Sequence, residues 1–238
     1  CQAIGNHVVT LTAFDAAGNT SSCSTTIRII DDLAPVANCP VTVTVSADNN
    51  CRVLASAVAG GLRMNRLNAD QPLTGPAQYK DNCEVTKITY SLLNPGSIVP
   101  ETDTITQLNN KVFRKGTTKI TYILSDANRN TTVCNFDVQV NDVTPPVRTG
   151  GQMPNDTIKV IALTGDCGVE VNWTPMTFAD NCDAAIAPQN VSSNRVPGDF
   201  FRVGVRPVTY TVRDSSGNQS QFTFYVKVED KQRPTARC

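Results

Sequence analysis

Cysteine is the residue type with the most chemistry to offer in this sequence. Nine cysteines stand against a single histidine, His7. A zinc site would need Cys-x-x-Cys pairs or neighbouring histidines, and the sequence has neither. Nucleophilic catalysis needs a base beside the nucleophile, and one imidazole cannot supply a Ser-His-Asp or Cys-His set. Paired carboxylates could cleave glycosidic bonds, but the acidic residues lie in turns and linkers. We therefore expect no catalytic residues, and expect the cysteines to form disulfides.

A repeated segment must position these cysteines. It recurs without gaps, and its copies are residues 5–31, 116–142 and 204–230. Each copy alternates apolar and polar residues along two arms, as at Ile120, Tyr122 and Leu124, which is the pattern of half-buried strands. A turn-forming cluster such as Asp126 to Asn130 separates the arms. Each copy therefore predicts a β-hairpin, and each is followed by a linker that runs from an acidic residue to proline.

Comparison of the repeats pairs six of the cysteines. Cys39 and Cys134 are both absent from the second full repeat, as expected if they bond to each other. Cys51 and Cys83 both recur, as Cys167 and Cys182. The predicted bridges are Cys39 to Cys134, Cys51 to Cys83 and Cys167 to Cys182. Each bridge stabilises a domain by roughly 2 to 4 kcal/mol and persists in an oxidising compartment, so we expect a secreted or cell-surface protein.

Three cysteines, Cys1, Cys23 and Cys238, have no predicted partner in the sequence. Cys23 takes the place of Cys134, and Cys238 that of Cys39, so their partners are expected upstream and downstream. The expected domains are 1–33, the closing hairpin of a truncated module; 34–144 and 145–232, two full modules; and 233–238, the start of a following module. The sequence is thus interpreted as a segment of a longer tandem protein.

Seven short strands in each full module, with turn signals and no helical periodicity, indicate an all-β fold of antiparallel β-sandwiches. Residues 104–108 are among the expected strands. Residues 59–80 contain several glycines and prolines and have no counterpart in the second module, so they are expected to form an irregular loop that could contact a partner. Trp173 alternates with Val169 and Val171, which predicts a core residue rather than a sugar-stacking platform.

Acidic residues gather where the expected modules meet. Hard cations bind carboxylate oxygens, and the candidate calcium ligands are Asp31, Asp32, Asp142 and Asp230. No other cofactor is expected. The alternative is that aspartate and asparagine in turns and linkers cap the backbone with their side chains.

Charge and hydropathy exclude two classes of partner. Lys plus Arg and Asp plus Glu are both 21, with no basic stripe for nucleic acid. No apolar run approaches the roughly 20 residues of a membrane-spanning helix.

The order of these motifs resembles the hyalin repeat (HYR), an immunoglobulin-like module. The motifs are Cys39-Pro40, the Asp-Asn-Cys triplet at 81–83, Gly-Thr-Thr-x-Ile-Thr-Tyr at 116–122 and the Asp-to-Cys spacing at 126–134. The resemblance implies tandem immunoglobulin-like β-sandwiches. The extra cysteine pair at Cys51 and Cys83 is similar to repeats in large secreted adhesins of Bacteroidota. That context implies O-glycosylation at Thr104 and Thr157, each within an Asp-Thr-Ile triplet.

The sequence favours a non-enzymatic structural and adhesive role. The expected protein is a stalk or filament segment whose partners are neighbouring modules of the same long chain or filament. Surface glycans and other cells are further candidate partners. A second hypothesis is an ancillary glycan-binding module of a secreted enzyme. A third is polymerisation by strand exchange between chains.

Overall fold

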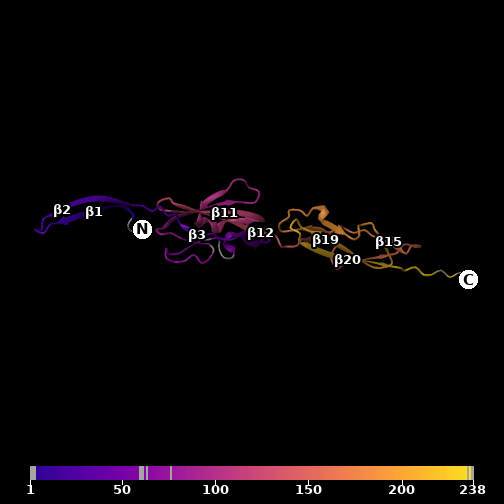
Figure 1. Cartoon of the computed structure of the whole chain (residues 1–238). Helices are drawn as coiled ribbons and strands as arrows, with labels where there is room; N and C mark the ends of the chain where they lie inside the picture. The colour runs from indigo at the N-terminus through magenta and orange to yellow at the C-terminus, as the bar shows by residue number, and fades with distance from the viewer. Residues whose placement is uncertain (1–3, 59–61, 63, 76, 235, 237–238) are drawn as a thin grey trace. The chain divides into compact units, whose positions relative to one another are not determined.

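The computed structural model describes residues 4–58, 62, 64–75, 77–234 and 236 (Figure 1). The chain divides into two compact units. Unit 1 consists of Cys1–Val45 and Arg52–Val140, and unit 2 of Ser46–Cys51 and Asn141–Cys238. Within the described residues the regular elements are strands and three short 3₁₀ helices, so the fold is all-β. None of the helices described is long and apolar enough to cross a membrane.

The three predicted hairpins are confirmed. They are β1 (Gly5–Phe14) with β2 (Thr20–Ile29), β11 (Gly116–Asp126) with β12 (Thr131–Asn141), and β19 (Gly204–Arg213) with β20 (Gln219–Glu229). All three pairs are antiparallel and share one register, in which the first glycine lies opposite Ile29, Val140 or Val228. The repeat in the sequence is therefore a repeat of one structural element.

Unit 1 is built around a five-stranded sheet of strand order β4-β12-β11-β8-β9. Its further strands are β4 (Val43–Ser46), β8 (Val85–Leu93) and β9 (Glu101–Thr104). Two small sheets accompany it. One pairs β10 (Val112–Arg114) with β5 (Arg52–Leu54), and the other has the order β3-β7-β6, formed by β3 (Val36–Asn38), β7 (Gln78–Lys80) and β6 (Asn65–Arg66).

The core of unit 1 follows the predicted alternation. Ile120, Tyr122 and Leu124 are fully buried, as are alternate residues of β12. The rings of Tyr122 and Phe136 lie 5.3 Å apart, and the Tyr122 hydroxyl donates a hydrogen bond to the carbonyl of Leu62. Burial of this much apolar surface is the main stabilising contribution to a small sandwich.

Two stretches of unit 1 differ from the sequence prediction. The expected loop 59–80 contributes β6 and β7, and its Leu62 and Met64 are buried. Parts of that stretch lie outside the described residues. The expected strand 104–108 is mostly a 3₁₀ helix, η2 (Ile105–Asn110), which places Leu108 fully in the core. In both stretches, apolar residues that do not follow strand alternation are buried in the core.

Unit 2 repeats the architecture with shorter elements. A four-stranded sheet has the order β14-β20-β19-β17, in which β14 (Thr157–Ile161) runs parallel to β20 and β17 (Val191–Ser193) antiparallel to β19. The other strands form two pairs, β15 (Gly168–Glu170) with β18 (Phe200–Arg202) and β13 (Val147–Gly150) with β16 (Thr177–Ala179). The two short helices not yet named are η1 (Ala55–Ala57) in unit 1 and η3 (Pro188–Asn190) in unit 2.

Trp173 lies in the core of unit 2, as predicted. It is buried, with its ring 6.1 Å from that of Phe201 and 5.4 Å from that of Phe224. Both pairs are edge-to-face, an arrangement that adds to the stabilisation from burial. The indole N–H donates to the hydroxyl of Tyr210 at 3.0 Å, so the one polar atom of the indole is satisfied.

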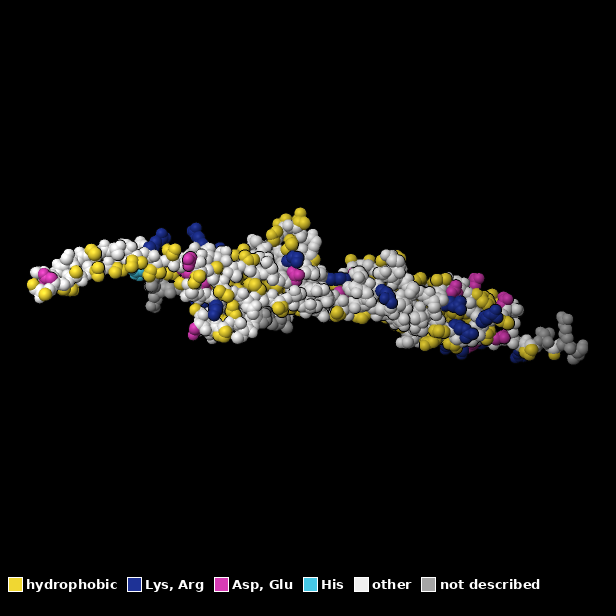
Figure 2. Space-filling view, viewed as in Figure 1, with side chains coloured by type: hydrophobic (Ala, Val, Ile, Leu, Met, Phe, Trp, Pro, Cys, Tyr) yellow, Lys and Arg dark blue, Asp and Glu magenta, His cyan; other side chains and the backbone are white. Residues whose placement is uncertain are grey.

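The β1–β2 hairpin exposes the face that the other two hairpins bury. Val9 and Leu11 are 46% and 70% exposed, although they correspond to the fully buried Ile120 and Tyr122. Figure 2 shows apolar side chains along this ribbon. No other described strand pairs with β1 or β2, and all residues of the two strands except Gly5 are exposed.

Candidate acidic sites and the disulfide framework

The structure confirms one predicted disulfide and corrects two. Cys39 is bonded to Cys134, as expected. Cys51 is bonded to Cys182 rather than to Cys83, so the predicted Cys51–Cys83 and Cys167–Cys182 bridges are both wrong. Cys83 is also disulfide-bonded. Cys167 and Cys23 are exposed free thiols, and Cys1 and Cys238 lie outside the described residues.

The position of the Ser46–Cys51 segment explains the change of partner. This segment belongs to unit 2, where the amide of Ala47 donates to the carbonyl of Asn141 at 2.8 Å. The Asn181 side chain donates to the carbonyl of Asp48 at 2.9 Å, which brings the Asp-Asn-Cys loop against the turn that ends at Cys51. Alignment identifies equivalent cysteines but does not tell whether they pair within one repeat or between successive repeats.

An asparagine in each hairpin turn holds the linker that enters the same unit. In unit 1 the Asn130 side chain donates to Asp126 and to the carbonyls of Asp31 and Leu33, at 2.7, 3.1 and 3.3 Å. The same contacts recur in unit 2, where Asn218 donates to Asp214, Asp142 and Thr144 at 2.7, 3.2 and 3.4 Å. We call this arrangement the linker clamp. The turn aspartates Asp126 and Asp214 thus cap the backbone and orient the clamp, as the non-metal hypothesis expected.

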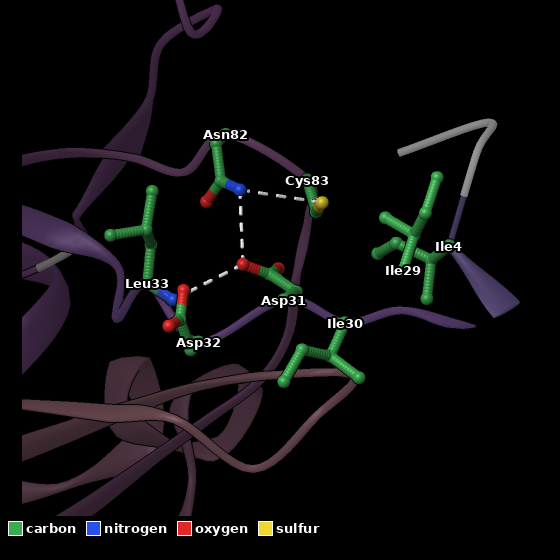
Figure 3. A pocket seen from close by; sticks show the side chains of 8 residues that line it. All are labelled: Ile4, Ile29, Ile30, Asp31, Asp32, Leu33, Asn82 and Cys83. Atoms are coloured by element: carbon green, nitrogen blue, oxygen red, sulfur yellow. Dashed lines mark hydrogen bonds between the residues drawn. The ribbon is translucent and has the colours of Figure 1, made fainter. Parts of the chain in front are cut away.

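Three carboxylates of unit 1 form a cluster at the entry linker. Oxygens of Asp31, Asp81 and Asp126 lie within 4.8 Å of one another. Asp31 accepts from the amide of Leu33 at 3.2 Å and from the Asn82 side chain at 3.0 Å, as Figure 3 shows. Asp81 accepts from the amide of Cys83 through one oxygen, while its other oxygen is buried and has no hydrogen-bond partner. An open hollow of ≈ 210 Å³ adjoins Asp31 and Asn82.

A related group in unit 2 contains two carboxylates. Oxygens of Asp142 and Asp180 lie within 4.8 Å of each other and of the Cys182 sulfur. That sulfur is in a disulfide, so it cannot act as a thiolate ligand. Asp142 accepts from the amide of Thr144 at 3.1 Å and the hydroxyl of Ser216 at 2.9 Å. One oxygen of Asp180 and the side-chain oxygen of Asn181 are buried without a hydrogen-bond partner.

The structure brings together only some of the expected calcium ligands. Asp31 and Asp142 belong to the two groups, whereas Asp32 and Asp230 belong to neither within the described residues. The list of expected ligands left out Asp81, Asp126 and Asp180. The recurrence of Asp-Asn-Cys and of the turn Asp-to-Asn spacing in the sequence was the signal that could have found them.

Hydrogen bonding and burial shift a few pKa values. The side chain and backbone of Asn19 donate to Asp15, which lowers the pKa of that carboxyl. The Lys227 ammonium lowers the pKa of Glu229, and burial raises the pKa of Tyr122. His7 lies on β1 opposite Ile27. These groups are spread over the units, so the perturbed pKa values do not mark a reactive centre.

The expected glycosylation residues lie at strand ends. Thr104 ends β9 and Thr157 begins β14, and each amide donates to the carboxylate of the preceding aspartate at 2.7 Å. Thr104 is exposed and Thr157 is partly buried. Glycosylation at these residues stays a prediction.

Curated relatives come from animals. "Hyalin" from Lytechinus variegatus is 28% identical over 99% of this chain and 39% of its own length. "Hyalin" from Strongylocentrotus purpuratus is 36% identical over 53% of this chain and 10% of its length. A "Sushi, von Willebrand factor type A, EGF and pentraxin domain-containing protein 1" from Rattus norvegicus is 30% identical over 50% of the chain and 3% of its length. The chain spans well under half of each relative, and these matches do not support the expected Bacteroidota context.

Two solved structures match this chain at low similarity. A protocadherin gammaB7 EC3-6 cis-dimer is 16% identical with a TM-score of 0.36, covering 94% of this chain and 60% of that one. A Ca2+-stabilized adhesin that helps an Antarctic bacterium reach out and bind ice is also 16% identical, with a TM-score of 0.29, covering 94% and 57%. At such low scores these likenesses add nothing to the fold described above.

The sequence profile of the HYR domain matches residues 99–140 and 141–228, and the break between the matches coincides with the boundary between the units at Val140 and Asn141. Each match includes one complete hairpin, β11–β12 or β19–β20. Because these matches cover more than half of its residues, the chain belongs to the HYR domain family.

Proposed function

We propose that this chain is a non-enzymatic structural and adhesive segment of an extracellular protein, built from tandem HYR modules that form a stalk or filament. The linker clamp is the observation that best supports this proposal. The same three hydrogen bonds from a turn asparagine hold the entry linker in unit 1 and in unit 2. A contact that recurs at both of these entry linkers is what a modular spacer requires, because such an array depends on nearest-neighbour geometry. Disulfides and the relatives named Hyalin support an extracellular location.

Adhesion by such modules would come from many weak contacts acting together. The test is aggregation of beads coated with the 238-residue chain, compared with beads coated with a chain unfolded by reduction and alkylation. We expect only the folded chain to aggregate beads, with a steep dependence on coating density. Absence of aggregation at every density would contradict the adhesive role.

A glycan array distinguishes the adhesive role from the alternative role, that of an ancillary glycan-binding module. Saturable binding to one glycan structure by the folded chain, without bead aggregation, would favour that role. Aggregation unaffected by free glycans would favour the structural and adhesive role.

A specific observation supports a divalent cation in unit 1. Carboxylate oxygens bind calcium at about 2.3 to 2.6 Å, so two ligands of one ion are separated by no more than about 5 Å. The oxygens of Asp31, Asp81 and Asp126 satisfy this limit, and the buried Asp81 oxygen lacks a partner. These residues fit the ion, whereas the unit 2 group offers two carboxylates and a disulfide sulfur. An ion bound here would hold Asp31, and with it the entry linker, against the hairpin turn.

Calorimetric titration with calcium chloride tests this site. Asp81→Asn keeps the oxygen that accepts from Cys83 but removes the charge, so we expect it to abolish binding in unit 1. Asp32→Asn is the matched control, because Asp32 is adjacent in sequence to Asp31 but outside the cluster. Equal calcium binding by the Asp81→Asn variant and the unaltered chain would refute the site.

A further inference from the structure

The free thiol of Cys167 occupies the position in its repeat that Cys51 occupies in the preceding repeat. The amide of Ala47 bonds to the carbonyl of Asn141 at 2.8 Å, and the amide of Ala162 bonds to the carbonyl of Glu229 at 3.0 Å. These two bonds fix the equivalence, because each ties the residue directly after β4 or β14 to the last residue before the linker. Cys51 follows Ala47 by a short turn, and Cys167 follows Ala162 by another.

The linker residues beside the two cysteines are also equivalent. Asp142 accepts from the amide two residues ahead at 3.1 Å, and Asp230 does the same with Gln232 at 2.8 Å. Asp142 lies against Asp180 and Cys182 of the Asp-Asn-Cys loop, in the group described above. Asp230 is therefore equivalent to Asp142, and its carboxylate would lie beside an Asp-Asn-Cys loop that docked at Cys167.

A backbone carbonyl completes the correspondence. The carbonyl of Asp48 accepts from the amide side chain of Asn181 at 2.9 Å. The equivalent carbonyl is that of Leu163, which accepts from the amide side chain of Gln232 at 2.8 Å. Gln232 also accepts from the amide of Gly165 at 3.2 Å. Its side chain therefore lies beside the Cys167 turn where the side chain of Asn181 lies beside the Cys51 turn.

We propose that Cys167 is a covalent docking site for the Asp-Asn-Cys loop of another HYR repeat, and that it forms with that loop the disulfide that Cys51 forms with Cys182. The loop asparagine replaces Gln232 at the carbonyl of Leu163, and the loop aspartate lies beside Asp230. The two thiols lose two protons and two electrons as the sulfur–sulfur bond forms. A disulfide oxidant such as glutathione disulfide takes these up and becomes two thiols.

The test pairs the unaltered chain with an acceptor chain that presents a free loop cysteine. The acceptor carries Cys51→Ser and Cys167→Ser, which release Cys182 and remove the competing site. It is labelled with ¹⁵N so that its peptides differ in mass from those of the unaltered chain. The two chains are mixed in a glutathione redox buffer, and the product is mapped without reduction. Fluorescence of Trp173 checks that the acceptor remains folded.

We expect a covalent dimer in which Cys167 of the unaltered chain is linked to Cys182 of the acceptor, at least about ten times as often as Cys23 is. Cys23 is the matched control, because it too is exposed and free. Cys167→Ser in the unlabelled chain should abolish the dimer, whereas Cys23→Ser should leave it unchanged. Asn181→Ala in the acceptor should slow the linkage, since it removes the amide that docks on Leu163.

Two outcomes would overturn the proposal. One is equal linkage of Cys23 and Cys167, which would show reaction of exposed thiols without docking. The other is that Cys167 yields only its glutathione adduct while Cys182 of the acceptor is accessible. Neither outcome bears on bead aggregation, so the adhesive role and this site can fail separately.

Discussion

The linker clamp gives the sharpest stability prediction. Asn218→Ala removes a side-chain amide that serves three acceptors, Asp214, Asp142 and Thr144. The amide has two hydrogens, so we count two hydrogen bonds at about 1 kcal/mol each. Asp214 is only 4% exposed, and leaving its oxygen without this donor adds about 1 kcal/mol or more. The expected loss in the free energy of unfolding of unit 2 is roughly 2 to 4 kcal/mol.

The assay follows from the position of the only tryptophan in the sequence. Trp173 lies in the core of unit 2, so its fluorescence during urea unfolding reports on that unit. Asn19→Ala is the matched control, because Asn19 makes the same turn contacts with Asp15 and no described contact to a linker. We expect a lower midpoint with an unchanged slope for Asn218→Ala, and no change for Asn19→Ala. A loss below about 0.5 kcal/mol for Asn218→Ala would refute the clamp as a stabilising contact.

Further predictions concern backbone space and pH. Gly151 has φ of +78°, and a Cβ there would lie 2.0 Å from the Pro175 carbonyl oxygen. Gly165 has φ of +86°, but a Cβ there would have nothing within 4 Å. Gly151→Ala should therefore destabilise unit 2 by several times the effect of Gly165→Ala, which comparison of the two urea midpoints checks. The contacts from Asn19 lower the pKa of Asp15 in the folded state, so they stabilise the turn above the pKa of the unfolded chain and are lost as pH falls through the folded value. Titration of the Asp15 carboxyl by NMR should show this lowered pKa, and Asn19→Ala should return it toward the ordinary value.

Local patterns in the sequence predicted local structure well. The alternation in 116–142 identified both the hairpin and its buried face, because a period of two leaves one face for the core. The joint absence of Cys39 and Cys134 from the second repeat identified a real bridge. Trp173 was placed in the core by the same alternation.

The wrong predictions concern contacts between successive repeats and buried apolar residues that follow no periodic pattern. Cys51 has an equivalent in each repeat whichever way the bridges run, so the partner is determined only when Ala47 is seen bonded to Asn141. Leu108 is buried by a 3₁₀ helix, and the two apolar residues of that polar stretch, Ile105 and Leu108, do not alternate as strand residues do. The acid cluster likewise depends on a linker, a loop and a turn that meet only in the folded unit.

The Cys51–Cys182 disulfide has a mechanical consequence. Tension applied to the two ends of the chain crosses this bond instead of the 131-residue separation that it spans. That bypassed stretch could otherwise lengthen by roughly 450 Å if it were pulled straight. The bridge between Cys39 and Cys134 overlaps it along the sequence, so neither loop opens while both bonds remain. Under oxidising conditions the stretch between these two cysteines therefore adds no length under tension, and a reducing agent would make it available for extension.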